Sequence, residues 1–216
     1  QAAGHGRARD IVGTRQHGAE GPDVEVHIGK VRDQQVAIEL LVVRVDGHHP
    51  AAALLQVGER VQPSLGGAQG ADLADALNLE VRALAEAGCQ NIQIDESLFA
   101  RKPGAALDYG FENLERAFHG CPKGVTRTVH MCCGYPDRLD NPDYPKADRQ
   151  AYFELAESIE YSSIMAVSFE DAHRHNDLKL LEHFARTSVI LGVVAIARSE
   201  IESSDEIVAR LEAALQ

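Results

Sequence analysis

The sequence predicts an α/β fold built on a parallel sheet. Helical and strand-like patterns take turns from residue 71 to residue 216. Several strand-like runs are continuously apolar, such as SVILGVV at 188–194, which is typical of strands buried on both faces. Two architectures fit this alternation, a doubly wound sheet and a (β/α)8 barrel. A whole barrel takes about 250 residues, so residues 71–216 would form roughly half of one.

The predicted elements follow one another in a regular order. A leading helix over 71–88 places Leu73, Leu77, Val81 and Leu84 on one face, and Gly88 ends it. Four strand-and-helix pairs follow, at 91–95 and 105–120, 124–132 and 147–159, 163–170 and 177–185, and 188–196 and 203–215. Serines before the last helix can cap it, and the acidic residues in its first turn suit the helix dipole.

The first 70 residues have a different composition. They hold 11 of the 18 glycines but no Phe, Tyr, Trp, Cys, Met or Asn. Residues 23–31 and 34–45 have strand-like patterns, yet the segment has few large side chains with which to fill a core. Two interpretations remain open for residues 1–70: an atypical N-terminal subdomain, or a stretch that is non-native or poorly ordered. Residues 71–216 form the regular α/β part.

Charge and composition exclude several classes of function. The formal net charge of −12 argues against binding a nucleic-acid backbone or an anionic membrane surface. The sequence has no apolar run of about 20 residues, which a membrane-spanning helix requires, and its first residues do not resemble a signal peptide. We therefore expect a cytoplasmic protein with small-molecule partners. The four cysteines are too few for a disulfide framework, so we expect reduced thiols.

Residues that bind metals or titrate follow three of the four predicted strands. They are Asp95 and Glu96, then His130 with Cys132 and Cys133, then Glu170 and Asp171; the fourth strand is followed by Ala195, with Arg198 nearby. Parallel α/β folds place their chemistry at the carboxyl ends of the strands. These residues are therefore the candidates for a functional site.

His130 and Cys132 are two positions apart, so on a strand their side chains point to the same side. Zinc suits a nitrogen and a sulfur ligand together with a carboxylate, which Glu170 could supply. The alternative interpretation is a histidine and two thiols packed in a core. Cys133, Cys89 and Cys121 are interpreted as packed thiols rather than ligands.

Asp95 and Glu96 have two open interpretations: a pair that acts on substrate, as an acid and base or by holding its amino group, or caps of the following helix. His173 and His175 are expected on an exposed polar loop. The sequence contains neither of the phosphate-binding glycine motifs GxGxxG and GxxxxGK[ST], so we do not expect a nucleotide cofactor.

Four stretches resemble a known family. They are AEAGCQNIQIDES, VHMCCGY, VSFEDAHRHNDLKLLEHF and VILGVVAIARSEIESSDEIVARLEAAL, in this order. Together they are similar to the C-terminal catalytic domain of the cobalamin-independent methionine synthases, and to their short single-barrel bacterial relatives in particular. The resemblance covers residues 71–216 and none of the first 70.

The resemblance implies part of a (β/α)8 barrel that moves a methyl group from 5-methyltetrahydrofolate to the thiol of homocysteine. It implies Zn²⁺ as cofactor, with His130, Cys132 and Glu170 as ligands. It also implies that Asp95 contacts the amino-acid substrate, with Glu96 beside it. It assigns no catalytic acid or base.

The sequence departs from the family pattern at several points. The fourth zinc ligand of the family, a cysteine in an APDCG-like motif, has no counterpart among residues 1–216. Ser97 replaces a usual proline, and Ala195 stands where an aspartate is common. Two alternatives therefore stay open: an inactive or weakly zinc-binding barrel fragment, and a related zinc thiol methyltransferase with a different methyl donor or acceptor.

Overall fold

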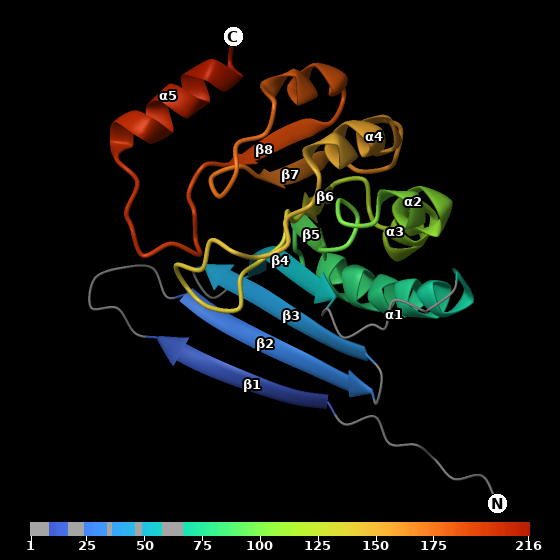
Figure 1. Ribbon diagram of the computed structural model, residues 1–216. Helices are drawn as coiled ribbons and strands as arrows, with labels where there is room; N and C mark the ends of the chain where they lie inside the picture. Colours follow the sequence, from blue (N-terminus) through green and yellow to red (C-terminus); the bar gives the residue numbers. More distant parts are fainter. Residues whose placement is uncertain (1–8, 17–23, 34–35, 46–48, 58–66) are drawn as a thin grey trace, which may run out of the picture. The chain divides into compact units, whose positions relative to one another are not determined.

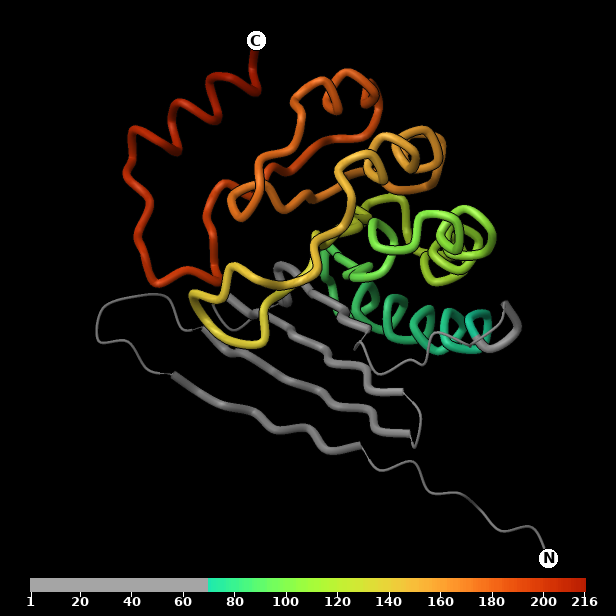
Figure 2. Tube along the Cα trace, viewed as in Figure 1, coloured from blue at the N-terminus to red at the C-terminus, as the bar shows by residue number. Residues whose placement is uncertain are grey.

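The computed structural model describes residues 9–16, 24–33, 36–45, 49–57 and 67–216, with side chains from residue 70 onward (Figure 1). The chain forms two compact units. The first contains the described residues up to Asp95 together with Arg116–Arg127, and the second contains Glu96–Glu115 and Thr128–Gln216. Figure 2 traces the backbone of the part from residue 70 onward in colour.

The first unit begins with antiparallel strands. In order these are β1 (Arg9–Gln16), β2 (Val24–Asp33), β3 (Val36–Val45) and β4 (His49–Val57), each paired with the next. β4 then pairs in parallel with β5 (Asn91–Glu96). The strands predicted over 23–31 and 34–45 are confirmed as β2 and β3, whereas β1 and β4 were not predicted. Both interpretations of residues 1–70 stay predictions.

The connection between β4 and β5 contains α1 (Gly67–Glu86). Its apolar face is buried as the spacing predicts, with Leu77 at 4%, Val81 at 0% and Leu84 at 8% exposure. Gly88 follows the helix with a φ of 93°, a conformation that glycine adopts without strain. The predicted helix over 71–88 is therefore confirmed, although it begins four residues earlier than expected.

The helix expected over 105–120 is interrupted. It consists of α2 (Pro103–Ala105), the π-helical η1 (Ala106–Gly110) and α3 (Phe111–Ala117). A side chain at Gly110 would meet the ring of Phe99 at 2.8 Å, which accounts for a glycine there. Gly120 follows α3 with a φ of 71°, and the predicted end of the helix is confirmed.

Three parallel strands form the sheet of the second unit. β6 (Thr126–Met131) pairs with β7 (Ala166–Glu170), and β7 pairs with β8 (Ser188–Gly192). Between β6 and β7 lies α4 (Arg149–Glu160), whose N-cap Asp148 accepts a hydrogen bond from the Gln150 amide. Tyr152 of α4 packs edge-on against Phe169 of β7 with ring centroids 5.6 Å apart. This helix and strand supply the core of the unit.

One prediction about the last part of the chain is confirmed only in part, and another is wrong. The segment expected as a helix over 177–185 is η2 (Leu178–His183), a 3-10 helix capped by Asp177. β8 was expected to be buried on both faces, but its residues are exposed or half-exposed and Ile190 is 48% exposed. An apolar run alone does not report burial, because an edge strand has neighbours on one side only.

α5 (Ser204–Ala214) confirms the predicted cap of the last helix. The Ser203 hydroxyl accepts from the Glu206 amide, and the Glu206 carboxylate accepts from the Ser203 amide, which is a capping box. Within the part of the chain that the structure describes, no helix has the length and apolar character needed to cross a membrane.

Candidate functional site

The main candidates lie at or directly after the carboxyl ends of strands β6 and β7. The register pairs His130 with Ser168 and Met131 with Phe169. Cys132 directly follows the end of β6, and Glu170 is the last residue of β7. Within the strands, side chains two positions apart share a face, so His130 and Glu170 lie on the face opposite the buried Met131 and Phe169.

The His130 ring is anchored by its neighbour on β7. Its Nδ1 lies 3.1 Å from the Ser168 hydroxyl. The ring is half-buried, and no other described group bonds to it. A histidine held through one ring nitrogen presents the other, here Nε2, in a defined direction, which is the usual arrangement of a metal-binding histidine.

The two adjacent cysteines differ in surroundings. Cys132 is half-buried and accepts a hydrogen bond at Sγ from the Gly134 amide at 3.4 Å. Cys133 is 1% exposed, and burial raises the pKa of its thiol to about 11, with the nearby Cys132 and Glu170 adding to the effect. Cys133 is therefore a protonated thiol at neutral pH, which agrees with its interpretation as a packed residue.

The turn after the cysteines requires a glycine. Gly134 has a φ of 117°, and a side chain there would come within 2.5 Å of the Pro145 carbonyl oxygen. The amide of Ala147 donates to the Cys133 carbonyl oxygen at 2.7 Å. The backbone thus folds back tightly against the cysteine pair.

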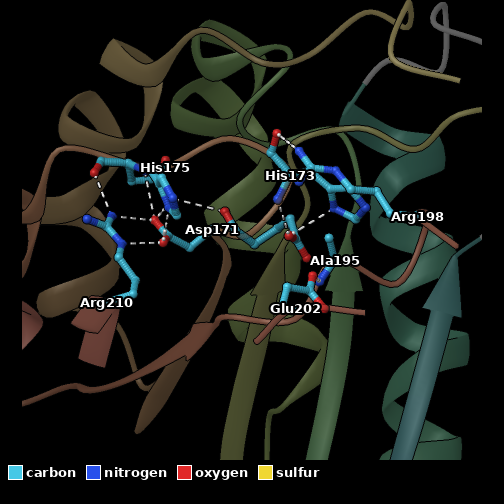
Figure 3. Close-up of polar contacts among 9 residues, drawn as sticks. Asp171, His173, His175, Ala195, Arg198, Glu202 and Arg210 are labelled. Carbon is cyan, nitrogen blue, oxygen red and sulfur yellow. Dashed lines mark hydrogen bonds and ion pairs between the residues drawn. The ribbon is translucent and has the colours of Figure 1, made fainter. Parts of the chain in front are cut away.

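Glu170 is held in place by His173. The carboxylate Oε1 accepts hydrogen bonds from the His173 amide at 3.2 Å and from its Nδ1 at 2.9 Å. His173 Nε2 accepts from the Ala197 amide at 3.0 Å, and the His173 side chain is only 6% exposed. The prediction of an exposed loop is therefore wrong for His173, because its ring links the end of β7 to the segment after β8 (Figure 3).

Asp171, next to Glu170, has a structural role. Its fully buried carboxylate accepts from Arg210 Nε at 2.7 Å and Nη2 at 2.8 Å, from the Asn176 amide at 2.8 Å, and from His175 at 3.0 Å (Figure 3). Burial alone would raise the pKa of Asp171, but these hydrogen bonds outweigh it and lower the pKa. The network ties α5 to the end of β7. His175, 63% exposed, matches the prediction of an exposed polar loop.

The residues that follow the fourth predicted strand, β8, also have a structural role. The buried Ala195 donates its amide to Glu202 Oε1 at 2.6 Å, and Arg198 Nη2 donates to the His173 carbonyl oxygen at 3.3 Å. These contacts fix the segment after β8 against the loop that follows β7. Alanine cannot bind a metal ion through its side chain, so Ala195 supplies no metal ligand, as the sequence indicates.

Asp95 and Glu96 are both half-buried at the end of β5. Asp95 accepts from Gln93 Nε2 at 2.9 Å. Neither residue caps the helix that follows, because the N-cap of α2 is Lys102, which makes no side-chain capping bond. The capping interpretation is therefore wrong, and contact with substrate stays a prediction.

The candidate residues fit the zinc prediction in their chemistry but not in their arrangement. The donor types fit zinc, and the three residues lie at or directly after the carboxyl ends of two paired strands. The described residues nevertheless contain no group of three or more His, Cys, Asp and Glu side chains already arranged to hold a metal ion. All four cysteines are free thiols; Cys89 donates to the Asn91 carbonyl oxygen, and burial raises the pKa of both Cys89 and Cys121.

Sequence reasoning missed three residues of the second unit that have shielded polar atoms. Arg174 and Tyr152 have side-chain polar atoms that are shielded from solvent and have no hydrogen-bond partner in the described part of the chain, and the Tyr144 hydroxyl is shielded beside the Cys133 thiol. The HRH triplet contains Arg174, but its setting between two histidines suggested an exposed loop. No periodic signal marks the two tyrosines.

Of the comparisons with known proteins, only the comparison with solved structures finds similar proteins. No family model matches the sequence, and no curated protein matches it. A B12-independent methionine synthase from Shewanella sp. W3-18-1, solved in complex with selenomethionine, is 28% identical with a TM-score of 0.61, over 71% of this chain and 45% of that chain.

A putative vitamin-B12-independent methionine synthase from Listeria monocytogenes is 21% identical with a TM-score of 0.50, over 71% of this chain and 46% of that chain. At this identity the likeness concerns the fold alone. The chain thus spans less than half the length of both solved structures. Its α/β fold is similar to that of part of the Shewanella B12-independent methionine synthase.

Proposed function

We propose that the chain is part of a zinc-dependent methyltransferase of methionine biosynthesis, which moves a methyl group from 5-methyltetrahydrofolate to the thiol of homocysteine. One observation carries the proposal: β6, which contains His130 and ends just before Cys132, pairs in parallel with β7, which ends at Glu170. The structural likeness to B12-independent methionine synthases supports it. In the complete enzyme the parallel strands would belong to a (β/α)8 barrel.

His130, Cys132 and Glu170 would hold the zinc ion. His130 offers Nε2, since Nδ1 faces Ser168. Glu170 offers Oε2, since His173 is the only described residue that donates to the carboxylate and both of its bonds reach Oε1. The side chains would have to turn toward one another to bind the ion, because they are not gathered around a common point.

Zinc would hold the substrate thiol as a thiolate. A free thiol has a pKa of about 8.5, and each unit by which coordination lowers it corresponds to about 1.4 kcal/mol in favour of the thiolate. Asp95 and Glu96 would hold the amino group of the amino-acid substrate. We also propose the cytoplasm as location, as the sequence predicts.

Zinc analysis of the purified protein tests this proposal. We expect about one zinc per chain, bound by a mixed nitrogen, sulfur and oxygen site. His130→Ala and Cys132→Ser should each abolish stoichiometric zinc. Cys121→Ser is the matched control, because it removes a half-buried thiol outside the proposed ligand set. Absence of zinc from the intact protein would contradict the proposal, as would zinc that survives both variants.

A second candidate is a fragment that binds zinc weakly and does not catalyse methyl transfer. The dispersed positions of the three proposed ligands favour it. Methyl transfer from 5-methyltetrahydrofolate to homocysteine, assayed with the zinc-loaded chain, separates the two. Methyl transfer to other thiols, or from other donors, would indicate instead a related zinc methyltransferase.

A further inference from the structure

The segment between β6 and α4 is a loop that is closed at its base. Residues 134–147 contain neither helix nor strand. The Ala147 amide donates to the Cys133 carbonyl oxygen at 2.7 Å, and a side chain at Gly134 would come within 2.5 Å of the Pro145 carbonyl oxygen. A loop whose two ends meet in this way is an Ω-loop, a class that is frequently functional. We refer to residues 134–147 as the Ω-loop.

The tip of the Ω-loop is anchored to the segment that follows β8. The Asp140 amide donates to the Ala197 carbonyl oxygen at 2.9 Å. The Asp140 carboxylate accepts from the Ser199 amide, at 2.6 Å to Oδ1, and from the Ser199 hydroxyl through Oδ2. Figure 1 shows the loop after β6 meeting the segment after β8. The partners lie 59 residues apart in the sequence, so this contact is not part of the local folding of the loop.

The backbone at Asp140 is adapted to this contact. Its φ is 59°, and no other non-glycine residue in the described part of the chain has a positive φ. Such a conformation is uncommon for a residue with a side chain and persists only where the surroundings hold it. The hydrogen bonds from the Ser199 hydroxyl and amide lower the pKa of Asp140, so its carboxylate is ionised at neutral pH.

Hydrogen bonds continue from the Ω-loop to the residues at both strand ends. At the base, the Gly134 amide donates to Cys132 Sγ at 3.4 Å. At the tip, the Ala197 amide donates to His173 Nε2 at 3.0 Å, and His173 Nδ1 lies 2.9 Å from Glu170 Oε1. All of these residues belong to the second unit. The loop therefore runs from the end of β6 to a segment that is bonded to the residues at the end of β7.

We propose that the Ω-loop is a lid over the carboxyl ends of β6 and β7, that the contact between Asp140 and Ser199 holds it closed, and that release of this contact exposes Cys132. Gly134 and Pro136 of the loop are buried, and Cys132, which Gly134 contacts, is half-buried. Asp140 and Ser199 are exposed, and exposed charged contacts are weak, so the lid can open without unfolding the unit. The inference goes beyond the proposed function, since it concerns access to the strand ends and requires neither zinc nor methyl transfer.

The rate at which a maleimide reacts with Cys132 in the native chain tests the inference. Asp140→Gly removes the carboxylate and keeps the backbone conformation, because glycine adopts a φ of 59° without strain. We expect the rate, followed by mass spectrometry of the Cys132 peptide, to rise by about 3- to 10-fold, as the loss of one or two exposed hydrogen bonds indicates. Asp143→Gly is the matched control. It makes the same substitution at another exposed aspartate of the Ω-loop and should leave the rate unchanged.

The size of the reagent separates access from a change in the chemistry of the thiol. An open lid favours a large reagent more than a small one, so Asp140→Gly should accelerate fluorescein maleimide more than N-ethylmaleimide. Ser199→Ala removes the hydroxyl donor and leaves the amide donor, so it should give a smaller rise in the same direction. The double variant should react no faster than Asp140→Gly alone, because both substitutions act on one contact.

One measurement on the parent chain depends on no variant. The Asp140 amide should exchange with deuterium at least about 10-fold more slowly than in an unstructured peptide, because it donates to the Ala197 carbonyl oxygen.

Four results would each overturn the inference: an unprotected Asp140 amide in the parent, equal rates in Asp140→Gly and the parent, an equal rise in Asp143→Gly, or the same acceleration for both reagents. Absence of zinc or of methyl transfer, with the lid behaving as expected, would overturn the proposed function alone. If Asp140→Gly does not fold, Ser199→Ala and the exchange of the Asp140 amide decide.

Discussion

The Glu170 carboxylate and the His173 imidazole form a directional pair, with Nδ1 of the histidine 2.9 Å from Oε1 of the glutamate. The Ala197 amide donates to the other ring nitrogen at 3.0 Å, so that nitrogen carries no proton. The contact geometry therefore assigns a neutral ring with its proton on Nδ1. Such a histidine orients the carboxylate through a hydrogen bond and does not neutralise its charge.

This pair predicts the effect of removing the His173 ring nitrogens. In His173→Phe, Glu170 loses its side-chain donor, and zinc affinity should fall by about 10- to 100-fold, as it does when partners of metal ligands are removed. Competition with a chelator measures this change. His175→Phe is the matched control, since it removes the exposed histidine of the same loop. Equal zinc affinity in His173→Phe and the parent would show that the pair does not serve a metal site.

The tautomer itself can be checked without metal. Nitrogen-15 spectra of histidine-labelled protein should show His173 with a protonated Nδ1 and a bare Nε2. A ring protonated at both nitrogens near pH 7 would contradict the assignment, because the Ala197 amide would then face a second donor.

The buried Asp171 predicts how stability depends on acid pH. Its pKa is lower in the folded chain than in the unfolded chain, so the folded state binds fewer protons there. The stabilisation is therefore present above the unfolded value of about 3.9 and is lost as pH falls through the folded value. Urea unfolding between pH 7 and pH 2 should show this loss.

Asp171→Asn should lower the free energy of unfolding at pH 7 by about 3 kcal/mol, because it leaves Arg210 without its buried partner. It should also flatten the pH dependence below about pH 4. Asp143→Asn, which changes an exposed carboxylate, is the control and should alter neither quantity. A parallel acid dependence in the parent and Asp171→Asn would contradict the assignment.

Cys132 and Cys133 should differ in reactivity although they are adjacent. Only a thiolate reacts readily with iodoacetamide, and burial raises the pKa of Cys133 to about 11. At pH 8 Cys133 is therefore protonated and also shielded, whereas Cys132 is half-buried. Mass spectrometry of the native chain should find alkylation at Cys132 well before Cys133. Unfolding in urea should equalise them, and equal rates in the native chain would contradict the packing of Cys133.

Local patterns predicted much of the fold because they depend on near neighbours. The spacing of Leu77 and Val81 is enough to indicate α1, and Ser203 with Glu206 is enough to indicate the start of α5. The burial of β8 could not be predicted, since it depends on whether another strand lies beside it. The π-helical turn between α2 and α3 was equally hidden, as was the Phe99 ring that leaves no room for a side chain at Gly110.

The candidate site was predictable in its residue types but not in its contacts. The strand pattern placed His130 near the carboxyl end of a strand, and this strand pairs in parallel with the strand that ends at Glu170. The role of His173 depends on the Ala197 amide, 24 residues away. Contacts between residues this far apart in the sequence leave no recognisable pattern in it.

The free edge of β8 predicts self-association. β8 pairs with β7, and no strand in the described ranges pairs with its other side. Ile190, at the centre of the strand, is 48% exposed. An exposed apolar edge strand offers unpaired backbone groups to a second chain.

The sedimentation coefficient should therefore rise with protein concentration, and Ile190→Lys should suppress that rise because a lysine on an edge strand opposes pairing. Ile201→Lys is the matched control, since Ile201 is 91% exposed and lies outside any strand. A chain that stays monomeric at high concentration, or one in which both substitutions act equally, would show that the β8 edge does not drive association.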